Sequence, residues 1–203
     1  MSSSSRIALE NWLKILEVNG KVLDIGGGTQ TLKGRVKVFK PDEYLIMDNN
    51  AEKNYHNKWT KADIKLDIQQ ENIYNQEINW PKYYSYFDQI FMIEVSEYLF
   101  NPIRALKNIY EMLNGGGKFY SSWHTLYGLH NPKGEDCLRY TKNAIKKLMN
   151  KSGFEIIEII PRIITEEGRV WLERFYRVEG MRLDYSDPET WNEGYLVKAK
   201  KVT

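Results

Sequence analysis

The chain has 203 residues, of which 42% are hydrophobic and 28% are charged, and its formal net charge at pH 7 is +2. This length and composition are typical of one globular domain, so we interpret residues 1–203 as a single domain with one core. No apolar run approaches the roughly 20 residues that span a bilayer, so no membrane span is predicted. The nearly balanced charge makes a nucleic-acid partner unlikely, because phosphate binding relies on a concentrated basic face.

The first five residues are predicted to be disordered. They read MSSSS and lack the charged and apolar regions of a secretory signal, so we expect a cytoplasmic protein. The single cysteine, Cys137, cannot form an internal disulfide, which agrees with a reducing compartment.

The chain then alternates between helical and strand patterns. A stripe of apolar residues at helical spacing predicts an amphipathic helix that ends at Asn19-Gly20, and its members are Leu9, Trp12, Leu13 and Leu16. The apolar run 21–25 predicts a buried strand. The turn that follows, Gly26-Gly27-Gly28, allows close approach to a ligand, since no Cβ intervenes.

Three further strands are each followed by an acid. After an irregular crossover over residues 31–40, the strands are predicted at 44–47, 62–66 and 87–93. The acids that follow them are Asp48, Asp67 and Glu94. Asp48 lies 24 positions beyond Asp24, close to the ~20-residue offset at which an acid reaches ribose hydroxyls in nucleotide-binding α/β folds.

The second half continues the alternation. Asn101-Pro102 and Thr141 are predicted to begin two helices as their caps. Strands are expected at 118–122, 154–160 and 195–202, and a partly amphipathic helix at 166–181. Residues 123–140 form a polar loop that holds two of the three histidines. Alternating strands and helices predict an α/β fold with an open, mostly parallel seven-stranded sheet and helices on both faces.

Taken together, these motifs resemble the class I S-adenosylmethionine-dependent methyltransferases. The resemblance runs from about Val22 to Phe154 and rests on VLDIGGGT at 22–29, the strand-end acids, Phe87-Asp88 and the LNGGG run at 113–117. It implies a Rossmann-like sheet whose last strand is antiparallel, and S-adenosylmethionine as the cofactor.

The resemblance also implies roles for individual residues. The glycine turn, Gly26 to Gly28, would meet the methionine part of the cofactor, and Asp24 would orient that turn or meet the ammonium group. Asp48, followed by Asn49, would accept hydrogen bonds from the ribose hydroxyls, since a carboxylate is acceptor-only. Three other residues would complete the cofactor site, namely Asp67 at the adenine amino group, Ile68 on the ring and Glu94 near the sulfonium. No residue is assigned to a metal.

Two positions depart from the family pattern. Gln30 replaces a frequent third glycine, and Tyr98 stands where a histidine commonly follows the glutamate after strand four. A narrower likeness lies in the loop, where His130, Asp136 and Arg139-Tyr140-Thr141 resemble a pattern found in small methyltransferases, some of them encoded beside polysaccharide genes.

The loop is expected to cover the carboxyl ends of the strands, where ligands bind in open α/β sheets. His124, His130 and Asp136 are therefore candidate catalytic bases, although Asp136 could instead form an ion pair with Arg139. The expected acceptor is a small molecule, possibly a sugar or polysaccharide precursor.

Two alternative functions stay open. A catalytically silent module that binds S-adenosylmethionine would share every motif described above. An NAD(P)-dependent oxidoreductase is the weaker alternative, because its fingerprint requires glycine at position 31, which is Thr31.

Overall fold

The structure is a computed structural model that describes residues 4–28, 30–49, 62–71, 80–126, 128, 135–163, 165–166, 168, 170, 173–174 and 192–203. Its α-helices are α1 (Ser4–Leu13), α2 (Pro102–Met112) and α3 (Lys142–Lys151), and its short 3-10 helices are η2 (Trp80–Tyr83) and η3 (Ser96–Tyr98). Its strands are β1 (Glu17–Ile25), β2 (Val38–Asp48), β3 (Ile64–Lys65), β4 (Phe87–Met92), β5 (Leu113–His124), β6 (Phe154–Ile163) and β7 (Asn192–Lys201).

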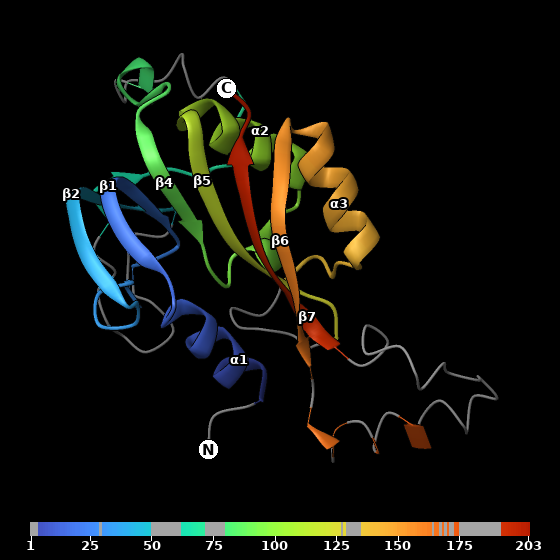
Figure 1. The fold of residues 1–203 in the computed structure, drawn as a ribbon. Coiled ribbons are helices and arrows are strands. Elements are labelled where there is room, and N and C mark those ends of the chain that lie inside the picture. Colours follow the sequence, from blue (N-terminus) through green and yellow to red (C-terminus); the bar gives the residue numbers. More distant parts are fainter. Residues whose placement is uncertain are drawn as a thin grey trace.

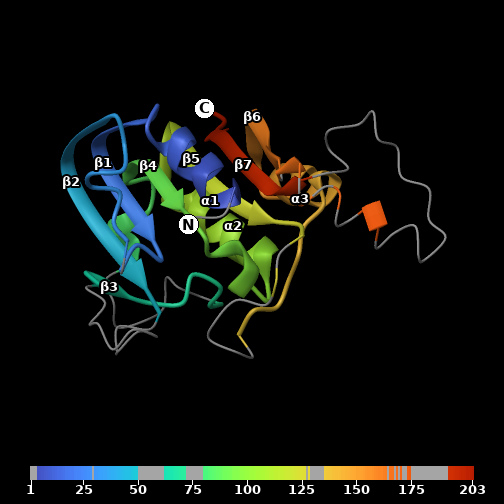
Figure 2. The ribbon, with the colours of Figure 1, turned by 90° about the horizontal axis from the view of Figure 1, so that it is seen from below.

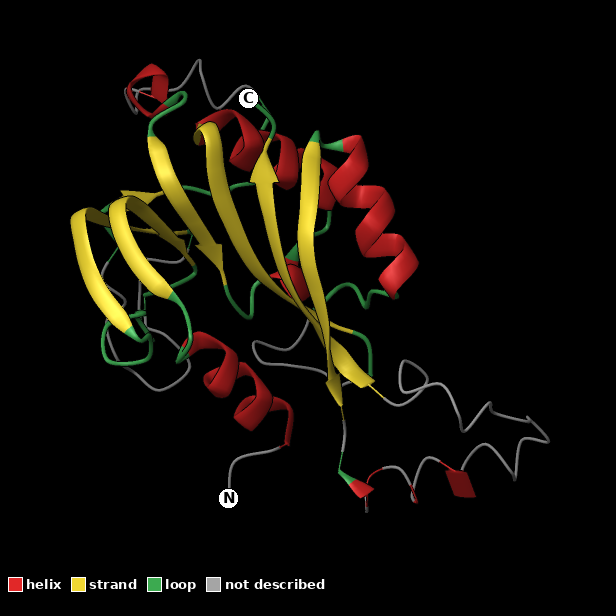
Figure 3. Cartoon of the chain, viewed as in Figure 1, coloured by secondary structure: helices red, strands yellow, loops and turns green. Residues whose placement is uncertain are grey.

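The strands form one seven-stranded sheet in the order β3-β2-β1-β4-β5-β7-β6 (Figures 1 and 3). The pairs from β3 to β5 are parallel, and β7 runs antiparallel between β5 and β6. This arrangement confirms the predicted α/β fold with its antiparallel last strand.

Helices cover both faces of the sheet, as predicted, and each face has its own core (Figure 2). On one face α1 packs against the sheet through Trp12, whose ring meets Tyr120 edge-on at 6.1 Å, and Tyr120 stacks on Phe91. Ile90, which precedes Phe91 on β4, points to the opposite core, under α2 and α3. This alternation follows from the two-residue period of a strand.

Two predicted boundaries near the start of the chain are wrong. Ser4 and Ser5 belong to α1 rather than to a disordered leader. Ser5 is fully buried, and its carbonyl oxygen accepts two hydrogen bonds from Arg162. In addition, Asn19-Gly20 does not end a helix but lies inside β1. Gly20 has φ +68° there, which accommodates a shift in the β1–β2 register.

Several strands differ in length from their predicted ranges. β2, β5, β6 and β7 are longer or begin earlier, and β3 is shorter. The LNGGG run, expected to connect a helix to a strand, already belongs to β5. Likewise, Trp123 and His124 end β5 instead of opening the loop. Ladder pairing with a neighbour, which local composition does not reveal, decides where these strands end.

Helix starts and the first crossover agree with the sequence. The side chains of Asn101 and Thr141 accept hydrogen bonds from the backbone nitrogens of Arg104 and Ala144, as N-caps do. Residues 30–37 contain no helix, as expected for an irregular crossover. The segment 51–60 and most of the helix expected at 166–181 lie outside the described residues. Among the described helices, none has the length and apolarity to cross a bilayer.

Candidate functional site

The candidate site lies at the edge of the sheet where the parallel strands β1, β2, β4 and β5 end (Figure 1). Parallel strands bring their carboxyl ends to the same edge, so Asp24, Asp48, Glu94 and His124 gather there although up to 100 positions separate them. Ligands bind at this edge in open α/β sheets, which makes it the candidate cofactor site.

The glycine turn lies between β2 and the segment that follows β4, and it contacts both. The Gly26 nitrogen donates to the Met47 carbonyl oxygen at 2.8 Å, and Gly26 has φ +75°. A Cβ at Gly26 would overlap the Val95 side chain, and one at Gly27 would overlap the Asp24 carboxylate. Glycine is therefore required here by neighbours within the protein, and the backbone of Gly26 stays exposed at the edge.

Asp24 lies beneath this turn and is 2% exposed. Its Oδ2 accepts a hydrogen bond from the hydroxyl of Tyr44, which in turn accepts one from the Leu32 nitrogen at 3.2 Å. Burial raises the pKa of Asp24 to about 7, against the opposing effect of the Tyr44 hydrogen bond. The structure thus places Asp24 where it can orient the turn.

Asp48 and Asn49 follow one another at the end of β2. Asp48 is half-buried and Asn49 is exposed. The negative charge of Asp48 contributes to the raised pKa of Asp24, which reflects how close the two strand ends lie. An acceptor-only carboxylate beside the glycine turn suits a ribose.

Asp67 and Ile68 lie just after β3. Asp67 Oδ1 accepts a hydrogen bond from the Gln69 nitrogen at 2.9 Å, so this carboxylate shapes a local turn. The Ile68 side chain is 4% exposed and belongs to the core, while its carbonyl oxygen accepts from the Asn108 amide at 2.6 Å. Contacts of these residues with an adenine ring stay a prediction.

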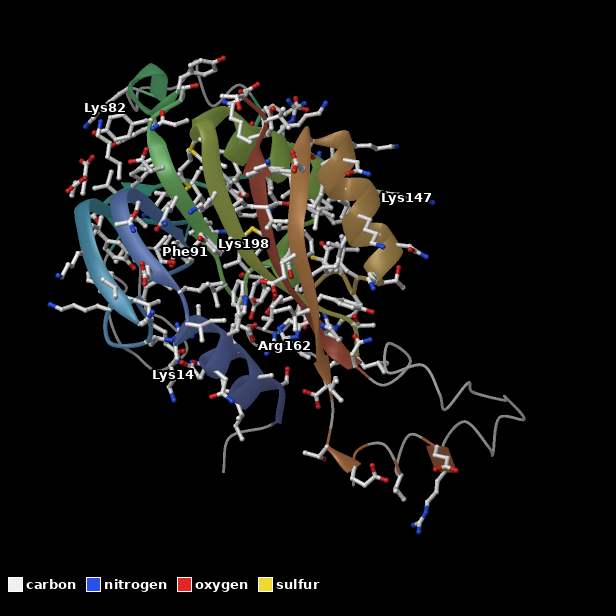
Figure 4. The ribbon with its side chains drawn as sticks, viewed as in Figure 1. Lys14, Lys82, Phe91, Lys147, Arg162 and Lys198 are labelled. Carbon is white, nitrogen blue, oxygen red and sulfur yellow. The ribbon has the colours of Figure 1, made fainter. Side chains whose placement is uncertain are left out.

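Glu94 adopts a left-handed backbone at the end of β4, with φ +56°. Its nitrogen donates to Ser122 Oγ at 2.7 Å, and that hydroxyl donates back to Glu94 Oε1 at 2.8 Å. Arg162 donates to the same Oε1 at 2.7 Å and is 1% exposed (Figure 4). This non-glycine φ is strained, and the surrounding hydrogen bonds hold it in place.

His124 completes a buried ion cluster with Glu94, Glu97 and Arg162. Its Nε2 lies 3.2 Å from Glu94 Oε2 and 3.3 Å from Glu97 Oε1, and both His124 and Glu97 are almost fully buried. Burial alone would lower the pKa of His124, but the two carboxylates outweigh it and raise the pKa to about 9. His124 and Arg162 likewise hold the pKa of Glu94 well below its usual range, against the effect of burial.

The loop after β5 is joined to η3 by its backbone. The nitrogens of Cys137 and Leu138 both donate to the Glu97 carbonyl oxygen, and the Tyr140 hydroxyl donates to that of Ser96 at 2.9 Å. Asp136 forms a two-pronged ion pair with Arg139, in which one N–O distance is 2.7 Å. His130 lies outside the described residues.

Carboxylates surround Tyr98 at this end of the sheet. Burial, followed by the charges of Glu97, Asp136, Glu94 and Glu135, raises the pKa of the Tyr98 hydroxyl well above its ordinary value. Among the described residues here, these four carboxylates face three cations, His124, Arg139 and Arg162. The site therefore has no excess of positive charge in the part that the structure describes.

Three residues of the candidate site were not predicted from the sequence, namely Tyr44, Glu97 and Arg162. Arg162 carried the strongest signal, because it is a charged residue inside the apolar run of β6. Tyr44 was part of a predicted strand, and Glu97 looked like an ordinary polar residue after β4.

The fold and the site together define a class of protein. A sheet of this order, with an antiparallel seventh strand, a glycine turn after β1 and an acid at the end of β2, is the Rossmann-like fold of the class I S-adenosylmethionine-dependent methyltransferases. Residues 5–159 match the family model described as a methyltransferase domain. The chain belongs to this family, and S-adenosylmethionine is the cofactor of its class.

Solved structures and one curated relative agree with this assignment. The fold is similar to an S-adenosylmethionine-dependent methyltransferase from Mesorhizobium loti, with a TM-score of 0.59, 13% identity and coverage of 97% of this chain and 98% of the other. A second such enzyme, from Archaeoglobus fulgidus, gives a TM-score of 0.55, 14% identity and coverage of 98% and 92%. At these identities the likeness establishes the fold.

The curated relative is a tRNA U34 carboxymethyltransferase from Sulfurovum sp. (strain NBC37-1). It is 26% identical over an alignment of 196 residues, which covers 88% of this chain. The chain spans 63% of the relative's own length.

Proposed function

We propose that this protein transfers a methyl group from S-adenosylmethionine to a small-molecule or sugar-containing acceptor. The observation that supports the choice of acceptor is the charge of the described part of the site, where four carboxylates face three cations. It therefore lacks the concentrated basic face on which phosphate binding relies. A cytoplasmic location stays a prediction from the sequence.

The described residues fit the cofactor by their chemistry. Gly26 offers exposed backbone at the edge, and Asp48 offers two acceptor oxygens for the ribose hydroxyls. When bound, S-adenosylmethionine supplies a methyl group that is already strongly electrophilic. The protein then has to align the acceptor and exclude water, which is mainly a positioning effect.

His124 has a different role in this proposal from the one that the sequence suggested. A pKa of about 9 keeps its imidazole protonated near neutral pH, so it acts as a buried cation between two carboxylates rather than as a base. Asp136 is engaged in the ion pair with Arg139, which is the alternative role that the sequence left open for it. His130 remains the candidate if the acceptor is a hydroxyl or a protonated amine.

The curated relative, named as a tRNA U34 carboxymethyltransferase, favours a second candidate function, transfer of a methyl or carboxymethyl group to a tRNA nucleoside. To separate the two, the enzyme would be incubated with labelled S-adenosylmethionine and either total tRNA or fractionated small metabolites, and label transfer would be counted. We expect label in the metabolite fractions. Label in tRNA alone would reject the small-molecule acceptor, and label in neither fraction would favour a silent binding module.

The cofactor assignment leads to a prediction for Asp48. Replacing Asp48 with Ala removes hydrogen bonds to a charged acceptor, worth roughly 1.5–3 kcal/mol, so the dissociation constant for S-adenosylmethionine should rise about 10- to 100-fold. Calorimetric titration measures this constant. The control is Asp42→Ala, an exposed carboxylate on the same strand, which should change it little. An unchanged constant in Asp48→Ala would reject the ribose assignment, and NAD binding without S-adenosylmethionine binding would reject the proposed function.

A further inference from the structure

We propose that Tyr44 is a positioning residue that holds the glycine turn in place for the cofactor. In this proposal the Asp24 carboxylate accepts the hydrogen bond from the Tyr44 hydroxyl beneath the turn, and it is not a direct ligand of the cofactor. We call the chain of contacts from the Leu32 nitrogen through the Tyr44 hydroxyl to Asp24 Oδ2 the Tyr44 bridge. The inference rests on the proposed function, because it takes the glycine turn as part of the cofactor site.

The segment after the turn needs such a support because it has no helix. Residues 30–37 form turns and bends between β1 and β2, so they contribute no helical hydrogen-bond ladder that would hold the turn. Leu32 is nevertheless 1% exposed and belongs to the core under α1. The Tyr44 bridge joins this buried residue to the strand that precedes the turn.

A second contact ties the same segment to α1. Arg35 donates to both carboxylate oxygens of Glu10, at 3.2 and 2.9 Å, and to the Gln30 carbonyl oxygen at 2.9 Å. Gln30 is the residue that replaces the family's frequent third glycine. The segment is thus held at both ends by side-chain hydrogen bonds, one set from α1 and one from β2.

The position of the Asp24 carboxylate argues against direct contact with the cofactor. It points under the turn, so that a Cβ at Gly27 would overlap it, and the residue is 2% exposed. The ring of Tyr44 is fixed in turn by an edge-on contact with Phe39 at 5.1 Å. A donor from β2 that is held by ring packing therefore binds Oδ2 of a buried carboxylate.

The test compares two tyrosine hydroxyls that both donate to carboxylates. Tyr44→Phe removes the bridge, whereas Tyr86→Phe removes a 2.6 Å hydrogen bond to Glu43, away from the strand ends. We expect the dissociation constant for S-adenosylhomocysteine, measured by calorimetry, to rise about tenfold in Tyr44→Phe and less than twofold in Tyr86→Phe. Thermal unfolding of both variants shows whether the loss of affinity only reflects a loss of stability. If the role of Tyr44 were purely structural, both variants would have lower melting temperatures but similar dissociation constants for S-adenosylhomocysteine.

Variants of Asp24 separate the bridge from a direct contact. Asn keeps an oxygen that can accept from Tyr44 but has no charge for an ammonium group, and Ala has neither. The inference predicts a smaller loss of S-adenosylhomocysteine affinity in Asp24→Asn than in Asp24→Ala. Equal losses in both, together with wild-type affinity in Tyr44→Phe, would overturn it. Failure of the wild-type protein to bind S-adenosylhomocysteine would instead reject the proposed function.

Discussion

At the scale of single residues, Arg162 joins the candidate site to α1. It is 1% exposed, donates to Glu94 at the end of β4, and also donates to the Ser5 carbonyl oxygen of α1. A buried arginine of this kind does not add much net stability by itself, because desolvation offsets the attraction. Its effect is geometric, since it keeps the strained backbone at Glu94 in one place.

This view predicts the behaviour of Arg162→Met. The substitution leaves the Glu94 charge buried with one cation fewer, so the free energy of unfolding should fall by roughly 3–5 kcal/mol. The double variant Arg162→Met/Glu94→Gln should recover part of that loss, because it also removes the carboxylate charge that Arg162 had balanced. Urea denaturation measures the free energy of unfolding of both variants. Arg104→Met, which breaks an exposed 3.4 Å ion pair with Glu71, is the control and should cost about 0–1 kcal/mol.

A loss in the double variant as large as in Arg162→Met would contradict this account. It would mean that the arginine stabilises the fold through its hydrogen bonds to α1, and that the pairing with Glu94 is incidental.

At the scale of elements, the end of the sheet opposite the site explains two sequence motifs that lie away from the strand ends. Asp88 accepts from the Lys21 nitrogen and from the Asn114 amide, both at 2.8 Å, and so joins β1, β4 and β5. The β4–β5 register shifts between Phe87 and Gln89, and the glycine-rich start of β5 absorbs this shift. The resemblance to the family at Phe87-Asp88 and LNGGG therefore has a structural cause.

Asp88→Ala should consequently reduce stability and leave cofactor affinity intact. The Lys21 nitrogen would lose its acceptor, which costs about 1–3 kcal/mol when the group is shielded from water. We expect a lower melting temperature in thermal unfolding, with an S-adenosylhomocysteine dissociation constant within twofold of wild type. A large change in that constant would show that the two ends of the sheet are coupled.

At the scale of the whole molecule, the buried ion cluster makes stability depend on pH. The pKa of His124 rises from 6.5 to about 9 on folding, so its contribution to stability is complete below pH 6.5 and is lost as the pH rises through about 9. Glu94 has the opposite dependence, because its pKa is lowered from 4.5 and its contribution is lost only in strong acid. The cluster therefore stabilises the fold most between about pH 4.5 and 6.5.

The prediction concerns how the pH dependence of the melting temperature differs between wild type and His124→Gln. The melting temperature of wild type should decline between pH 7 and 9.5 more steeply than that of the variant, which lacks this titration. Thermal unfolding across that range in matched buffers checks it. Parallel declines would show that His124 is not protonated in the folded protein. Burial of Asp24, whose pKa is raised to about 7, affects both proteins alike and cancels in the difference.

Much of the fold followed from the sequence, and less of the site did. The run of β-forming residues at 87–93 and the caps at Asn101 and Thr141 are local signals, and the corresponding elements formed as predicted. The strand limits were less accurate, because ladder pairing with neighbours extended β2 and β5 beyond their local patterns. Asp24, Asp48, Glu94 and His124 do meet at one edge, as chain order in a parallel sheet requires.

The sequence by itself determined which residues arrive at the strand ends, because the alternation of strands and helices and the glycine turn are local properties of the chain. Only the tertiary structure decided what those residues do there. The pKa of His124 is raised because Glu94 and Glu97 lie within 3.3 Å of its Nε2, and Arg162 donates to Glu94 across 68 positions of sequence. Charge state and hydrogen bonding depend on distances through space and on burial, and neither is defined until the segments have packed.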